Sequence, residues 1–165
     1  MTSPLVIDTN VTIVANGQAE QAPLDCVSAC IVALQDARHK RPVLIDDLGL
    51  ILDEYRRYLS FAGQPGPGDS FFKWLWDNQA NELYCRAVTI TAQDEREFLE
   101  FPDDPDLAGF DRSDRKFVAV AIASAAFPVV LNASDTRSWG TYQEPLAKHS
   151  VRIEFLCPEL MKERG

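Results

Sequence analysis

The sequence lacks any apolar run that approaches the roughly 20 residues needed to cross a bilayer. Residues 1–4 are too short and too uncharged to open a secretory signal peptide. It also lacks internal repeats and low-complexity segments. We therefore expect a soluble, cytoplasmic protein with no membrane partner, whose 165 residues, 46% of them hydrophobic, form one domain over residues 1–158 and a polar tail over residues 159–165.

The chain also lacks an excess of positive charge, and its formal net charge is −9. This charge argues against a protein that holds nucleic acid through its overall electrostatic field. It leaves room for an enzyme that clusters acids around a cation and places a few local Arg and Lys residues at phosphates. Acidity is also a common means of solubility, so the charge alone does not select a function.

The four cysteines lack the Cys-x-x-Cys spacing of a zinc site and the density of a disulfide scaffold. Cys26 and Cys30 are one helical turn apart and would share a face. The favoured interpretation for these two and for Cys85 and Cys157 is a set of buried thiols, since free cysteine behaves as a small hydrophobic residue. A disulfide or a soft-metal site is the alternative.

Five short segments with strand patterns alternate with helical patterns along the chain. These segments cover residues 5–7, 43–45, 86–90, 128–131 and 151–156, of which the first, second and fourth are apolar runs. Strands that alternate with helices indicate a parallel sheet covered on both faces. The sequence therefore predicts a three-layer α/β/α sandwich with a central, parallel, five-stranded sheet.

The patterns between these runs predict the order of the other elements. The chain should open as a strand, a loop around residues 16–18 and a helix with Asp25 near its cap. Residues 91–94 resemble a capping box that opens a short helix through Leu99. Residues 117–123 are apolar nearly all round, which is typical of a helix buried between layers.

Acidic residues stand where several of these elements meet. Asp8 follows the first strand, Asp111 and Asp114 stand at the start of the buried helix, and Asp135 follows the fourth strand. Glu54 joins them from the helix after the second strand. Because right-handed connections put all strand-to-helix loops at one edge of a parallel sheet, these acids are expected to converge.

Packed carboxylates repel one another, so such a cluster persists when a hard cation or basic residues neutralise it. Oxygen ligands without His or Cys favour Mg²⁺ or Mn²⁺ over zinc. The metal ion could activate a water for phosphodiester hydrolysis. The plainer alternatives are a strand-ending turn for Asp8, a solvated helix acid for Glu54 and an Asx turn for Asp135. Of Asp111 and Asp114 at the helix start, one would cap the helix while the other binds the metal.

Four segments, residues 6–10, 45–55, 114–121 and 132–135, together resemble the PIN domain nucleases, a family that includes many bacterial toxin ribonucleases. The resemblance implies a parallel α/β/α sandwich that binds one or two Mg²⁺ or Mn²⁺ ions and hydrolyses single-stranded RNA. On the matching positions, Asp8, Glu54, Asp114 and Asp135 would bind the metal and carry catalysis, with Thr9, Asn10, Asp111 and Ser134 as polar support. The family often places a further acid after the fourth position, where this chain has Thr136, Arg137 and Ser138.

Basic side chains lie next to the expected ligands in the sequence. Arg112, Arg115, Lys116 and Arg137 are the candidate RNA contacts, because arginine binds phosphate in a bidentate manner. Ion pairs with the acidic surface are the alternative for each of them.

The leading hypothesis is therefore a metal-dependent endoribonuclease. Its extension is that the protein is the toxin of a toxin–antitoxin pair and has an antitoxin protein as its partner. A homodimer is the candidate assembly. A different enzyme class is an aspartyl-phosphate phosphatase, because residues 8–12 loosely resemble haloacid dehalogenase-type enzymes. Those enzymes normally carry a second aspartate where Asn10 stands. A third hypothesis is an inactive PIN-like module that binds or regulates without turnover.

Overall fold

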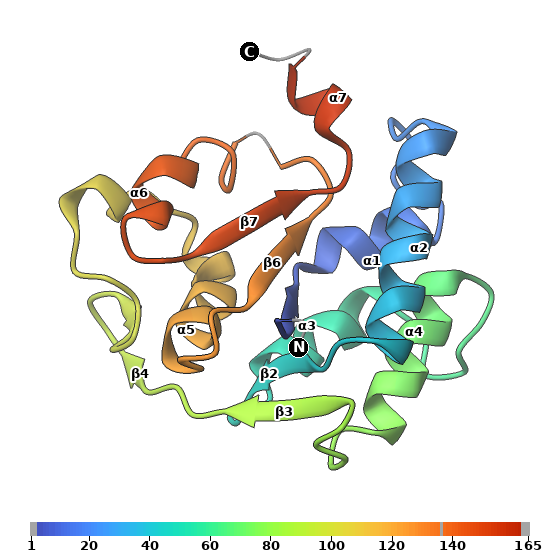
Figure 1. The fold of residues 1–165 in the computed structure, drawn as a ribbon, viewed down its shortest axis with the longest axis horizontal. Helices are drawn as coiled ribbons and strands as arrows, with labels where there is room; N and C mark the ends of the chain where they lie inside the picture. Colours follow the sequence, from blue (N-terminus) through green and yellow to red (C-terminus); the bar gives the residue numbers. More distant parts are fainter. Residues whose placement is uncertain (1–2, 136, 163–165) are drawn as a thin grey trace.

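The computed structural model describes residues 3–135 and 137–162, and its fold is shown in Figure 1. Five parallel strands form the main sheet: β1 (Leu5–Ile7), β2 (Val43–Asp46), β3 (Cys85–Val88), β6 (Val129–Asn132) and β7 (Arg152–Phe155). β1 is buried along its whole length, as expected for a central strand covered on both faces. The predicted parallel, five-stranded sheet is confirmed.

The order of the strands places the first strand at the centre of the sheet. The order is β3-β2-β1-β6-β7, so the chain moves outward from β1 to β2 and β3 and then returns to the other side of β1. Such a reversal creates a crevice beyond the carboxyl ends of the two central strands, where ligands of open α/β sheets bind. The segments that follow β1 and β6 are therefore neighbours.

Helices flank the sheet on both sides. They are α1 (Thr9–Ala15), α2 (Leu24–His39), α3 (Leu50–Tyr58), α4 (Pro67–Asp77), α5 (Arg115–Ala123), α6 (Gln143–Ala147) and α7 (Pro158–Lys162). In Figure 1, α1, α2 and α4 lie together to the right of the sheet, while α5 and α6 lie to the left. α5 contacts β1, β2 and β6, and most of its residues are buried, as its apolar sequence predicts. None of the helices in the described residues is long and apolar enough to cross a membrane.

Two local features differ from the expectation. The chain turns at residues 16–18 as expected, but helix α1, which was not predicted, lies between β1 and this turn. The short helix expected after residue 91 is instead a hairpin of β4 (Ala92–Gln93) and β5 (Glu97–Phe98). Arg112 donates to the carbonyl oxygens of Asp94 and Glu95 and so holds the hairpin turn.

Several smaller features complete the fold. Asp25 lies in the first turn of α2, whose cap is Pro23. Two short 3₁₀ helices, η1 (Pro105–Leu107) and η2 (Arg112–Asp114), precede α5. The expected polar tail begins at residue 159, so its first four residues belong to α7.

The cysteines divide into two groups. Cys26 on α2 and Cys157 after β7 form a disulfide, so the favoured interpretation as buried thiols is wrong for these two. It is confirmed for Cys30 and Cys85, which are free and buried. The bond joins residues 131 positions apart, which is why spacing in the sequence did not reveal it.

Candidate active site

Asp8 ends the central strand and begins helix α1. One of its carboxylate oxygens accepts the backbone N–H of Asn10 at 3.0 Å, which caps the helix. Its side chain is 6% exposed, so the charge is almost completely removed from water. Burial is the largest cause that raises the pKa of Asp8 well above its usual value, and the charge of Asp114 is the next.

Glu54 projects from α3, and two side chains hold its carboxylate. The Thr9 hydroxyl donates to one oxygen, and the Lys116 ammonium lies 2.7 Å from the other. Lys116 also donates to the carbonyl oxygen of Ser113. Lys116 is therefore the counter-cation of Glu54.

The position of α3 is fixed by groups that the sequence analysis did not assign to the site. The buried Asp46 carboxylate accepts the N–H groups of Leu50 and Ile51 at 2.9 and 2.8 Å and so anchors the start of the helix. The Tyr55 hydroxyl donates to the carbonyl oxygen of Ile7, one residue before Asp8. Tyr55 was visible in the sequence only as part of an apolar stripe, which gives no sign of this hydrogen bond.

Asp111 and Asp114 have different roles at the start of α5. Asp111 accepts the backbone N–H of Ser113 at 2.9 Å and caps η2. Asp114 makes no side-chain cap. Burial, followed by repulsion from Asp111, Glu54 and Asp135, raises the pKa of Asp114 to about 7, while Lys116 acts in the opposite direction.

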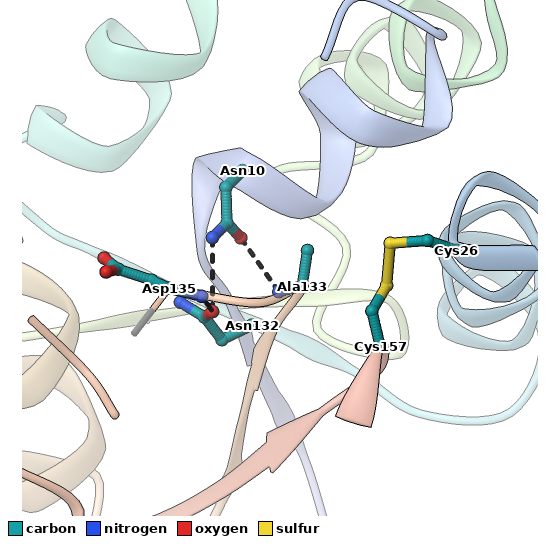
Figure 2. Close-up of a disulfide and its surroundings, with 6 residues drawn as sticks. All are labelled: Asn10, Cys26, Asn132, Ala133, Asp135 and Cys157. Atoms are coloured by element: carbon teal, nitrogen blue, oxygen red, sulfur yellow. Dashed lines mark hydrogen bonds between the residues drawn. A yellow bond between two sulfur atoms is a disulfide. The ribbon is translucent and has the colours of Figure 1, made fainter. Parts of the chain in front are cut away.

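Asp135 lies in the loop after β6, and two asparagines hold this loop against α1. Asn10 donates to the side-chain oxygen of Asn132 at 3.2 Å and accepts the N–H of Ala133 at 3.1 Å (Figure 2). The same Asn132 oxygen accepts the N–H of Asp135 at 2.8 Å. Ser134 lies half buried in this loop.

Asn132 is a site residue that the sequence analysis did not single out. It stands at the end of an apolar run, as Asp8 does, and this shared position is the signal that could have identified it. The side chain is completely buried, and its amide nitrogen has no partner within the described structure. A buried donor of this kind usually meets a water or a ligand oxygen.

The structure thus brings Asp8, Glu54, Asp114 and Asp135 together from four separate segments. Asp114, Glu54 and Asp135 each raise the pKa of Asp8, which places the four carboxylates within electrostatic range of one another. Acids with strongly raised pKa values concentrate at functional sites, so this cluster is the candidate active site.

The donor set fits a hard divalent cation held partly through water. All four acids offer carboxylate oxygen, the ligand that Mg²⁺ and Mn²⁺ prefer. Within the described residues, however, no three of these carboxylates place oxygens within 4.8 Å of one another. Mg²⁺ usually keeps several waters and takes only one or two carboxylates, so an ion here would be held partly through its waters.

A pocket of about 180 Å³ opens beside Glu54. Its lining comprises Leu50, Asp53, Glu54, Arg57, Glu97, Phe98, Arg112, Ser113 and Lys116. Arg112 is half exposed there and pairs with Glu97 at 2.8 Å. Arg57 is exposed on the neighbouring turn of α3. Glu54 therefore shares this pocket with three cationic side chains, those of Arg57, Arg112 and Lys116.

The two other arginines named from the sequence lie in different surroundings. Arg115 is 4% exposed, and its guanidinium donates to the carbonyl oxygens of Phe110 and Ala108 while it lies over the Phe101 ring. It holds the loop before α5 and is not accessible to RNA. Arg137 is exposed, and its backbone N–H donates to Asp135 at 3.0 Å.

Comparisons with models of known protein families, with curated proteins and with solved structures each returned no match. The function therefore has to be inferred from the residues of the site.

Proposed function

We propose that this chain is a metal-dependent endoribonuclease of the PIN type, which hydrolyses phosphodiester bonds of single-stranded RNA. The observation that carries the proposal is the convergence of Asp8, Glu54, Asp114 and Asp135 at the crevice between β1 and β6. Ligands of open α/β sheets bind at this place. The choice of RNA as the substrate follows from the resemblance to PIN domain nucleases.

Asp8 and Asp114 are the residues that would hold the ion directly, because burial and mutual repulsion make their charges the most costly in its absence. Glu54 and Asp135 would hold it directly or through its waters. When bound, Mg²⁺ or Mn²⁺ would lower the pKa of a coordinated water and offset charge on the phosphate.

Neutral residues of the chain orient this site. Thr9 fixes one oxygen of Glu54, and the amides of Asn10 and Asn132 fix the loop that carries Asp135. The free amide nitrogen of Asn132 offers a hydrogen bond to a water or to a phosphate oxygen. Positioning of this kind supplies much of the rate acceleration in phosphoryl transfer.

The cations of the pocket are suited to the flanking phosphates. With a net charge of −9, the protein cannot attract RNA through its overall field, so local contacts have to do so. Arg57, Arg112 and Lys116 line one pocket next to Glu54. Arg137 is exposed two residues after Asp135. Arg115 is left out of this set because it is buried.

The test is cleavage of an end-labelled single-stranded RNA with Mg²⁺ or Mn²⁺ by wild type, Asp8→Asn and Asp114→Asn. We expect each substitution to reduce the cleavage rate at least 100-fold. Asp53→Asn is the matched control, because Asp53 is the exposed neighbour of Glu54 in the same pocket. This variant should cleave the RNA like wild type. Cleavage by Asp8→Asn and Asp114→Asn at the wild-type rate would contradict the proposal.

The same samples separate the two alternatives. A phosphatase of the haloacid dehalogenase type would form a covalent aspartyl phosphate on Asp8 with a phosphomonoester. Asn10, which stands where those enzymes carry their second aspartate, uses its amide to hold the β6 loop. An inactive module would leave the Lys116–Glu54 pair in place and bind no Mn²⁺. A toxin role would be supported by a neighbouring gene for a small DNA-binding antitoxin.

A further inference from the structure

Three cysteine sulfurs meet on the side of α2 that faces the end of β7. Cys26 and Cys30 are one turn apart on α2, and Cys157 follows β7. All three are buried, and their sulfur atoms lie within 4.8 Å of one another. They are the only group of three or more His, Cys, Asp or Glu residues at this spacing in the described part of the chain.

Figure 2 shows the oxidised state of this cluster, in which Cys26 and Cys157 share a disulfide. A dithiol reductant can convert it, giving up two electrons and two protons and becoming a disulfide itself, while the Cys26–Cys157 bond is replaced by two thiols. Reducing compartments keep protein thiols in that form. The reduced protein then holds three thiols, those of Cys26, Cys30 and Cys157, around one point.

We propose that the reduced protein binds one Zn²⁺ ion through the sulfur atoms of Cys26, Cys30 and Cys157. Binding replaces the three thiol protons, which are released to solvent, with three zinc–sulfur bonds. This site is separate from the carboxylate cluster and does not depend on the proposed ribonuclease activity.

The geometry is close to that of a zinc site. Zn–S bonds of roughly 2.3 Å in a tetrahedral site put the sulfurs roughly 3.8 Å apart. The three sulfurs already lie within 4.8 Å of one another, so side-chain rotation is enough once the disulfide is open. The backbone at the three cysteines is held in place, because Cys26 and Cys30 belong to a regular helix and the N–H of Cys157 donates to the carbonyl oxygen of Ala133 at 3.0 Å.

Charge favours a divalent ion over a monovalent one at this place. Three thiolates with Zn²⁺ leave one negative charge, whereas three thiolates with Cu⁺ leave two, and buried net charge is costly. A pocket of about 190 Å³ opens directly onto Cys26 and Cys157 and also has Asp25 and Glu159 in its lining. It offers the ion a way in and room for a water or a carboxylate as the fourth ligand, which Zn²⁺ takes besides three protein ligands.

A metal ion here would keep the connection that the disulfide makes. The N–H of Cys157 donates a hydrogen bond to the carbonyl oxygen of Ala133 in the loop after β6. The N–H of Ala133 donates in turn to the side-chain oxygen of Asn10 (Figure 2), which is two residues after Asp8. Disulfide and zinc would therefore be two ways to fasten α2 to the same loop, one for each redox state.

The test uses the full chain, freed of metal and reduced with a phosphine that binds metals weakly. Titration with Co²⁺ should give one equivalent of binding with a sulfur-to-cobalt charge-transfer band, and Zn²⁺ should abolish the band. Metal bound at the carboxylate cluster gives no such band, so the result is independent of the ribonuclease proposal. The oxidised protein should give no band.

Two variants decide which sulfurs take part. Cys30→Ala should weaken Co²⁺ binding at least tenfold, whereas Cys85→Ala, which removes the other free buried cysteine, should bind like wild type. Absorption fine structure at the zinc edge of the wild-type protein should require three sulfur neighbours, and this measurement does not depend on the folding of a variant. No band in the reduced protein, equal binding by Cys30→Ala, or fewer than three sulfur neighbours would overturn the proposal.

Discussion

Replacement of Asp114 by Asn should stabilise the metal-free protein while it removes activity. The pKa of Asp114 is raised from its usual value of 3.8 to about 7, because burial and three neighbouring acids oppose its charge. A difference of this size corresponds to a ceiling of about 4 kcal/mol in folding free energy. Partial exposure of the side chain screens the repulsion, so we expect Asp114→Asn to raise the free energy of unfolding by about 1–3 kcal/mol at pH 8.

The effect should depend on pH in one direction. The folded state holds the Asp114 proton more tightly than the unfolded state, so the wild-type protein loses stability as the pH rises from about 4 to about 7. Above pH 7 the full loss is present, and below pH 4 it is absent because the carboxyl is protonated in both states. The advantage of Asp114→Asn should therefore be large at pH 8 and vanish near pH 4.

Urea unfolding in EDTA, followed by the fluorescence of the buried Trp139, measures this difference. Asp53→Asn is the control, because Asp53 is exposed and should shift neither the midpoint nor its pH dependence. Addition of Mn²⁺ should stabilise the wild-type protein more than Asp114→Asn. The reasoning fails if Asp114→Asn is less stable than wild type at pH 8 in EDTA, or if its advantage is the same at pH 8 and pH 5.

Three further outcomes are expected. Lys116→Met removes the counter-cation of Glu54 and should tighten Mn²⁺ binding several-fold by calorimetry; weaker binding would mean that Lys116 supports the ion rather than competes with it. Tyr55→Phe removes the buried hydrogen bond to the Ile7 carbonyl and should lower the free energy of unfolding by about 1–2 kcal/mol in urea titrations, and no change would show that this bond is not formed. Cys157→Ser should lower the free energy of unfolding of the oxidised protein by up to about 5 kcal/mol, because the disulfide closes a very long loop. In metal-free reducing buffer the same substitution should change the free energy of unfolding little. A similar loss in both buffers would point to packing instead.

The sheet was predictable from the sequence because its central strands are short apolar runs with polar ends. Residues 5–7 and 129–131 are continuous runs of β-branched and leucine side chains, which is typical of a strand covered on both faces. The outer strand β7 alternates polar and apolar residues instead. Alternation of strands with helices then indicated the parallel arrangement.

Helix α1 shows where this reasoning stops. Its residues, Thr9 to Ala15, include Val11, Thr12, Ile13 and Val14, which favour a strand by intrinsic propensity. The helix forms because Asp8 caps it and because its buried face packs against α2 and α4. Tertiary packing of this kind overrides local propensity and cannot be read from the segment alone.

The candidate site was predictable in its acids and in the polar residues Thr9 and Asn10, but not in the long-range contacts that hold them. Asp8 and Asp135 could be identified because each stands at or shortly after the end of an apolar strand. The segments that follow β1 and β6 meet because the strand order reverses at β1. The Lys116–Glu54 pair joins positions 62 apart, and the Cys26–Cys157 disulfide joins positions 131 apart. Such contacts depend on how whole elements pack, so no local pattern announces them.

Neutral groups hold part of the framework of the site, so we expect Asp114 to be exchangeable for Asn without collapse of the site. Asn10 and Asn132 join the segment after β1 to the loop after β6 without using any of the four carboxylates' charges. Tyr55 joins α3 to β1 in the same way. Because these bonds remain when Asp114 becomes Asn, a loss of cleavage in that variant would report on the chemistry of the carboxylate and not on a collapsed site.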